Sequence, residues 1–142
     1  MALTRIANAS AIAACNAVVD RLDLSTPTPG YVEIRSGSQP SDPDAAATGT
    51  LIVTITLQDP AFAAAADINP GARAAVNGTP NAAAVAGAVA GWFRAYTGGN
   101  AKVIQGNCGG TGSGEDMELD NTTVALGQTV TIVTWTVTQP ES

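Results

Sequence analysis

Few side chains in this sequence could perform catalysis. The 142-residue chain has no histidine and a single lysine, Lys102. Nucleophilic catalysis needs a base that activates the nucleophile, and histidine is the usual one. No Gly-x-Ser-x-Gly turn is present, and Lys102 lies in an ordinary strand pattern. The sequence therefore predicts a protein that is not an enzyme, with no catalytic and no cofactor-binding residue.

Acidic residues near position 118 are the strongest candidates for metal ligands. They are Glu115, Asp116, Glu118 and Asp120, and the last three alternate onto one face of a strand. Carboxylate oxygens at this spacing suit Ca²⁺, but the remaining ligand positions of an EF-hand loop are missing here and around Asp42 and Asp44. Acidic strand edges also prevent unwanted strand pairing. We favour such an edge and predict no metal site, with calcium as the alternative.

A glycine-rich run precedes this cluster, and two cysteines lie far apart in the sequence. Residues 107–116, NCGGTGSGED, lack the Lys-Ser/Thr pair of a phosphate-binding loop and end in two acidic residues, so we expect a flexible loop. Cys15 and Cys108 form no metal-binding motif, and we expect free thiols. The alternative is a disulfide, which would stabilise the chain by about 4 kcal/mol.

The charge of the chain excludes several partners. The formal net charge is −6, and the six basic residues are scattered. An acidic chain repels phosphate backbones, so no nucleic-acid partner is expected. The longest apolar run, NAAAVAGAVAGWF, is too short to span a bilayer, so no membrane contact is expected. The first residues, MALTRIANAS, lack the leucine-rich core of a secretory signal, which favours synthesis in the cytoplasm.

One helix is expected at the N-terminus, over residues 4–22, which hold no Pro or Gly. Its polar stripe comprises Arg5, Asn8, Asn16, Asp20 and Asp23. The remaining apolar arc is wide, which predicts a helix covered on more than one side. We expect it to pack on its own sheet, with contact to another subunit as the alternative.

The rest of the chain has the alternation and turns of β-strands. We expect strands over residues 31–36, 51–57, 73–77, 84–96, 101–106, 117–120, 122–126 and 129–138. The apolar phase slips within residues 129–138, which predicts a β-bulge or a strand that passes between two sheets. In residues 61–90, alanine favours helix while proline and glycine oppose it.

These elements predict a single mainly β domain over residues 1–142. Its parts are an N-terminal helix within residues 1–24, an antiparallel β-sandwich or jelly-roll-like fold over residues 31–138, and a C-terminal tail at residues 139–142.

Four stretches of the chain resemble small virion structural proteins of tailed bacteriophages. They are MALTRIANASAIAACNAVVDRLD, YVEIRSGSQPSDPDAAATGTLIVTITLQDPAF, AGWFRAY and the closing TVTIVTWTVTQPES. The resemblance implies a non-enzymatic capsid decoration (cement) protein in the virion, made in the host cytoplasm. Its partners would be the major capsid protein or other virion proteins, with homo-oligomer or lattice contacts. The alternatives are a minor tail or neck protein and an extracellular β-sandwich adhesin or binding module.

In a cement protein, residues without a role in the core are the natural contacts. We expect both termini to be held by partners. The predicted assembly contacts are Ala2, Leu3, Thr4, Arg5, Ile6, Gln139, Pro140, Glu141 and Ser142.

Overall fold

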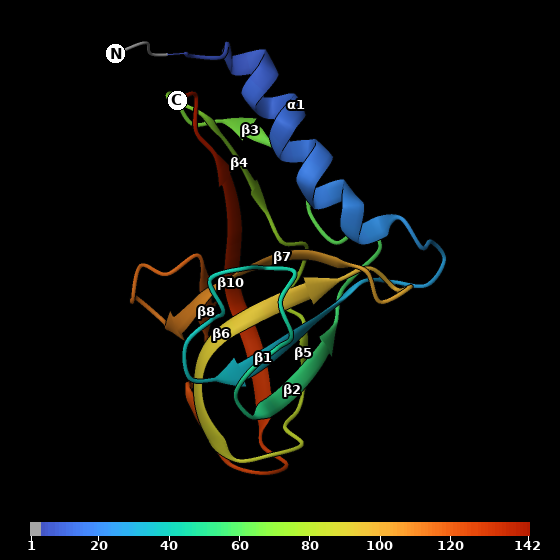
Figure 1. The fold of residues 1–142 in the computed structure, drawn as a ribbon, viewed down its shortest axis with the longest axis vertical. Coiled ribbons are helices and arrows are strands. Elements are labelled where there is room, and N and C mark those ends of the chain that lie inside the picture. Colours follow the sequence, from blue (N-terminus) through green and yellow to red (C-terminus); the bar gives the residue numbers. More distant parts are fainter. Residues whose placement is uncertain (1–3) are drawn as a thin grey trace.

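Strand β10 (Thr129–Gln139) runs the length of the molecule and pairs with three other strands in turn. The computed structural model describes residues 4–142. The first part of β10 pairs with β5 (Asn81–Ala83), the middle with β8 (Met117–Leu119) and the last part with β4 (Ala72–Ala75). The short strand β3 (Ala66–Asp67) adds to the outer side of β4. Figure 1 shows β10 joining a curled sheet at one end to the helix at the other.

The sheet curls back on itself. Its order runs β2-β1-β6-β7-β8-β10, and β9 pairs with β6. The remaining bounds are β1 Tyr31–Ser36, β2 Leu51–Thr56, β6 Ala88–Tyr96, β7 Lys102–Gly110 and β9 Thr123–Val124. Val85, just after β5, donates its N–H to the carbonyl of Ile52 in β2, so the two ends of the curl meet.

The prediction of a mainly β fold with one N-terminal helix is confirmed. All named strand pairs are antiparallel except β7 with β8, so the sheet is mixed. Only residues 111–116 connect this parallel pair, although parallel neighbours usually need a longer crossover. The curled arrangement is compatible with the predicted sandwich or jelly-roll-like fold.

A β-bulge in β10 places Trp135 in the core. The pairing with β8 shifts register between Ile132 and Thr134, as the slip in apolar phase predicted. Val133 is 38 % exposed, whereas Trp135 is 1 % exposed. Its ring meets Phe62 and Phe93 edge-on, with centroid distances of 4.8 and 5.1 Å. Such aromatic pairs add stability beyond the area they bury.

The helix starts later than predicted. Helix α1 spans Asn8–Val19 and continues as a single 3-10 turn, η1 (Asp20–Asp23). Ala7 caps it in an extended conformation and has no side-chain oxygen to bind the free N–H groups. Before the helix, the chain is extended, and the N–H of Ile6 donates to the carbonyl of Glu141. Helix propensity in the first residues is therefore overridden by a contact with the other end of the chain.

One stripe of the helix is buried, not a wide arc. Its members are Ala11, Cys15 and Val19, and Leu22 in η1 continues it. The helix packs against β4 and β10, so the expected packing on its own sheet is confirmed. Ala13 and Ala17 are exposed, and the predicted cover on more than one side is wrong within this chain. Alanine tolerates either environment, so an alanine-rich arc overstates the buried face.

Three further segments differ from expectation. Asn107–Gly110 extends β7, so only residues 111–116 form a loop. Glycine at position 106 lets β7 run past Phe93 without a clash, because a Cβ there would lie 3.0 Å from the ring of Phe93. The short strands β3 and β5 were not predicted in the alanine-rich middle. Gln139 pairs with Ala72 and belongs to β10, not to the tail.

No helix within residues 4–142 combines the length and the apolar character that crossing a bilayer requires.

Replacing Trp135 tests the bulge. We expect Trp135→Ala to lower the free energy of unfolding by about 3–5 kcal/mol, because it empties the space between two aromatic rings. Val133→Ala, two positions away on the exposed side, should cost less than about 1 kcal/mol. Urea unfolding curves measure both values, and Trp135→Phe serves if the alanine variant does not fold. Equal losses for positions 133 and 135 would contradict the bulged register.

Candidate functional site

The first described residues, 4–6, lie beside residues 139–142 at one end of the molecule (Figure 1). The hydrogen bond from Ile6 N–H to Glu141 O measures 2.9 Å and ties the N-terminal segment to the C-terminal tail. We call this end the terminal surface. It consists of Thr4, Arg5, Ile6, Gln139, Pro140, Glu141 and Ser142. The predicted contacts within the described residues are thus brought together, while Ala2 and Leu3 lie outside the described residues.

The terminal surface combines anchored and exposed groups. Ile6 packs partly on the hydrophobic core, and Thr4, Arg5 and Pro140 are exposed. The pairing of β10 with β4 delivers the tail to this place, since Gln139 is the partner of Ala72. This surface can supply hydrogen bonds and small ionic contacts to another protein, because its backbone is extended and its side chains are accessible.

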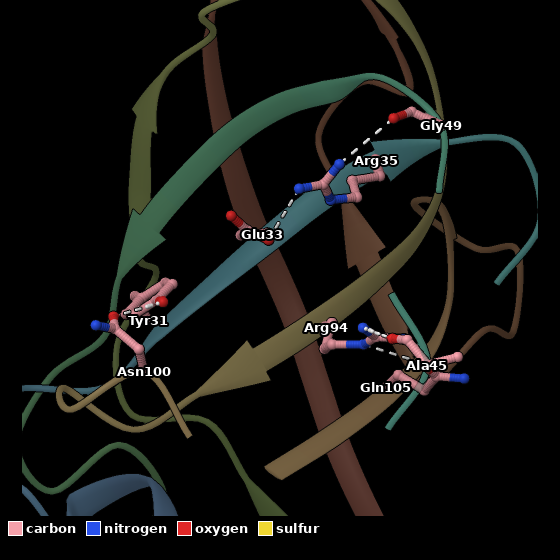
Figure 2. A network of polar contacts seen from close by, with 8 residues as sticks. All are labelled: Tyr31, Glu33, Arg35, Ala45, Gly49, Arg94, Asn100 and Gln105. Atoms are coloured by element: carbon pink, nitrogen blue, oxygen red, sulfur yellow. Dashed lines mark hydrogen bonds and ion pairs between the residues drawn. The ribbon is translucent and has the colours of Figure 1, made fainter. Parts of the chain in front are cut away.

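A second polar group lies on the outer face of β1, β6 and β7 (Figure 2). Its centre is Arg94, which is only 1 % exposed. One guanidinium nitrogen, Nη1, donates to the carbonyl of Ala45 at 2.7 Å. Nε and Nη2 both donate to Oε1 of Gln105, at 3.1 and 2.8 Å. The guanidinium carbon lies 5.2 Å from the ring centroid of Trp92, a cation–π distance.

Residues 37–50, which we call the strap, cover this face. Three side chains of β7 hold the strap in addition to Arg94. Gln105 Nε2 donates to Pro40 O at 2.6 Å, Lys102 Nζ donates to Asp44 O at 2.6 Å, and Asn107 Oδ1 accepts from Gln39 Nε2 at 2.9 Å. The strap can lie this close to β6 only because position 91 is glycine, since a Cβ there would collide with the carbonyl oxygen of Gly37. The strap is therefore fixed without secondary structure of its own.

The edge of the same face holds an ion pair and stacked tyrosines. Arg35 Nη2 lies 3.2 Å from Glu33 Oε1, and Arg35 Nη1 donates to the carbonyl of Gly49. The rings of Tyr31 and Tyr96 stack at a centroid distance of 5.0 Å. Burial raises the pKa of both phenols, and the Glu33 carboxylate raises each further. Both tyrosines therefore stay neutral at physiological pH and act as packing and hydrogen-bonding groups.

The acidic cluster fixes turns of the chain. Glu118 Oε2 accepts the N–H of Gly114 at 3.0 Å, and Asp120 Oδ1 accepts those of Asn121 and Thr131 at 2.9 and 3.0 Å. Backbone N–H groups of the glycine loop hold the pKa of Glu118 below its usual value. Between residues 4 and 142, no three His, Cys, Asp or Glu side chains converge as metal ligands would.

Both cysteines are free and buried, so the alternative of a disulfide is not realised. Cys15 Sγ donates to the carbonyl of Val137 at 3.3 Å. Burial raises the pKa of both thiols, and that of Cys108 reaches about 12, with Glu115 adding to the effect. The thiolate is the reactive form, so neither side chain is poised for chemistry.

Comparisons with known proteins give no relative for this chain. No protein-family model and no curated protein matches the sequence, and no solved structure matches the fold.

Arg94 was not singled out from the sequence as a site residue. One signal was available, because Trp92, Arg94 and Tyr96 alternate onto one strand face and place a cation between two aromatic rings. The sequence did not indicate that Arg94 would bind the carbonyl of Ala45, because every residue has a backbone carbonyl and its type does not mark it as an acceptor.

Substituting Arg94 tests the fixing of the strap. In Arg94→Met the acceptors on Ala45 and Gln105 lose a charged donor, and we expect a stability loss of about 3 kcal/mol. Amide hydrogen exchange in residues 39–47 should accelerate at least ~10-fold, because these residues lose a buried anchor. Arg73→Met is the matched control, since exposed Arg73 makes one side-chain hydrogen bond, to Thr138. Unchanged exchange in the strap of Arg94→Met would contradict this assignment.

Thiol reactivity tests the cysteine environments. We expect neither thiol of the native chain to react with a disulfide reagent at about pH 8, because a raised pKa leaves almost no thiolate and burial blocks access. Both should react once the protein is unfolded in guanidinium chloride. Rapid reaction of native Cys108 would show that its burial is wrong.

Proposed function

We propose that this chain is a non-enzymatic structural protein of a phage particle, a cement protein that binds the head shell through its terminal surface. The observation that supports it is the Ile6–Glu141 hydrogen bond, which joins the two predicted contact segments into one surface. The link to phage particles comes from the resemblance of the sequence. The major capsid protein is the proposed partner.

The terminal surface has the properties that a bridging contact needs. Its two segments are anchored on one side, by the half-buried Ile6 and by the pairing of Gln139 with Ala72, and are accessible on the other. A pre-ordered surface loses little conformational entropy on binding. Contact with two neighbouring shell subunits at once would resist their separation, and ligands that bind the assembled state stabilise it by mass action.

The terminal surface has little net charge on its side chains, so it exerts little long-range electrostatic attraction. Arg5 and Glu141 carry opposite signs, so the surface does not share the acidic character of the whole chain. Binding should therefore rely on short-range contacts, and repetition over a lattice raises the total effect.

A ring in the neck or tail of the particle could use the same surface. Electron microscopy of particles carrying a labelled chain distinguishes the two, because a cement protein covers the head and a neck protein occupies one vertex.

Two changes at the N-terminus test the proposal. We expect deletion of residues 1–5, and separately Arg5→Ala, to leave the unfolding midpoint unchanged, because Ile6 and its hydrogen bond remain. Both should reduce co-sedimentation with particles that lack this chain, at least ~10-fold in affinity for the deletion. Particles decorated with the deleted chain should also release their DNA at a lower temperature than those carrying the intact chain.

Arg21→Ala is the matched control, because Arg21 is also exposed but lies at the far end of the helix. It should bind and protect particles as the unaltered chain does. If the deleted chain folds and protects particles equally well, the terminal surface is not the attachment site.

A further inference from the structure

The end of the molecule opposite the termini displays three large apolar side chains. Val85, Val89 and Leu126 are 63, 60 and 73 % exposed. They come from two segments, residues 84–89 and 124–128, which we call the neutral end and which include the start of β6 and the end of β9. Figure 1 shows these segments beyond the start of β10, whereas the C-terminus lies beyond its end. At ~3.3 Å per residue, the length of β10 separates the two surfaces by ~33 Å.

The two segments form one rigid surface. Ala84 N–H donates to Gln128 O at 2.8 Å, and Gly127 N–H returns a bond to Ala84 O at 2.9 Å. Strands β6 and β9 extend this contact, with Ala88 opposite Val124. The backbone that carries the three apolar side chains is therefore held in place, and burying them requires little further ordering of it.

The neutral end carries no charge. Residues 74–93 and 121–140 contain no Asp, Glu, Lys or Arg, so every charged side chain of the protein comes from elsewhere in the sequence. The nearest one along the chain is Asp120, whose Oδ1 is bound to the N–H groups of Asn121 and Thr131. The residues between the apolar side chains are mostly alanine and glycine, which let another surface approach closely.

We infer that the neutral end binds a second copy of this chain in a two-fold contact. Two copies each carry a net charge of −6 and repel one another wherever their carboxylates face. Residues 84–89 and 124–128 carry no carboxylate, so charge repulsion between these segments does not oppose the free energy gained by burying Val85, Val89 and Leu126 against the same residues of the second copy. Two-fold contacts between identical surfaces are the commonest form of association in soluble proteins.

This contact is independent of the proposed attachment to a phage particle. The terminal surfaces of the two copies remain free, because they lie at the far ends of both β10 strands. A partner of opposite charge would find no ionic contact at the neutral end, which favours a second neutral surface.

Sedimentation velocity of the full chain over a range of concentrations tests the inference. We expect a monomer–dimer equilibrium in the unaltered protein, and no dissociation of the dimer by added NaCl, since no ion pair holds it. Leu126→Glu should weaken the dimer at least ~100-fold, because it places two carboxylates at the contact. Val89→Ser should weaken it less, by loss of apolar area alone.

Leu24→Glu is the matched control. Leu24 is 64 % exposed but follows the helix, away from the neutral end, and its substitution should leave the dimer intact. Circular dichroism must show each variant folded. A chain that stays monomeric at all concentrations, or a dimer weakened equally by Leu24→Glu, would overturn the inference. Particle binding that Leu126→Glu abolishes in a monomeric chain would assign the neutral end to the shell instead.

Discussion

The structure depends on one strand changing partners along its length. β10 pairs with β5 at its start and β4 at its end, and with β8 across its middle, where the register shifts between Ile132 and Thr134. An unbroken alternation would have left Trp135 on the opposite face from Ile132, and both are buried in the same core. Because of the bulge, β10 places buried residues in the curled sheet around its first part and beside the strands that the helix covers at its last part. The length of β10 also sets the distance between the terminal surface and the neutral end.

A buried cation stabilises the outer layer of the sheet. The chain has few aromatic residues to cover both faces, and it covers one face with the strap, a loop without regular structure. Holding a loop in one conformation costs conformational entropy, which contacts must offset. Arg94 supplies several at once, because its fork of donors reaches both Gln105 and Ala45 while its face lies on Trp92. Lysine could not replace it, since an ammonium group lacks this planar geometry.

Local patterns predicted the elements whose burial alternates along the chain. Strands β1 and β2 follow the apolar residues of 31–36 and 51–57, and the slip in phase located the bulge in β10. Patterns failed where the deciding contact is distant. Just before α1, the N–H of Ile6 donates to Glu141, at the other end of the chain. The strand at Asn107–Gly110 pairs with β6 and β8, and β5 pairs with β10. For the candidate site, residue types indicated the two terminal segments, but not that one hydrogen bond joins them, nor that Arg94 holds the strap.

The terminal surface and the neutral end differ in the charged and the apolar side chains that they carry. The terminal surface offers extended backbone and one charge of each sign, which suits a partner of different composition. The neutral end offers exposed apolar side chains on an uncharged segment pair, which suits a copy of itself. In the proposed arrangement, a chain with the two surfaces at opposite ends of β10 attaches to the shell at one end and to a second copy at the other. Neither contact obstructs the other, because a two-fold contact at the neutral end leaves the two terminal surfaces at opposite ends of the pair.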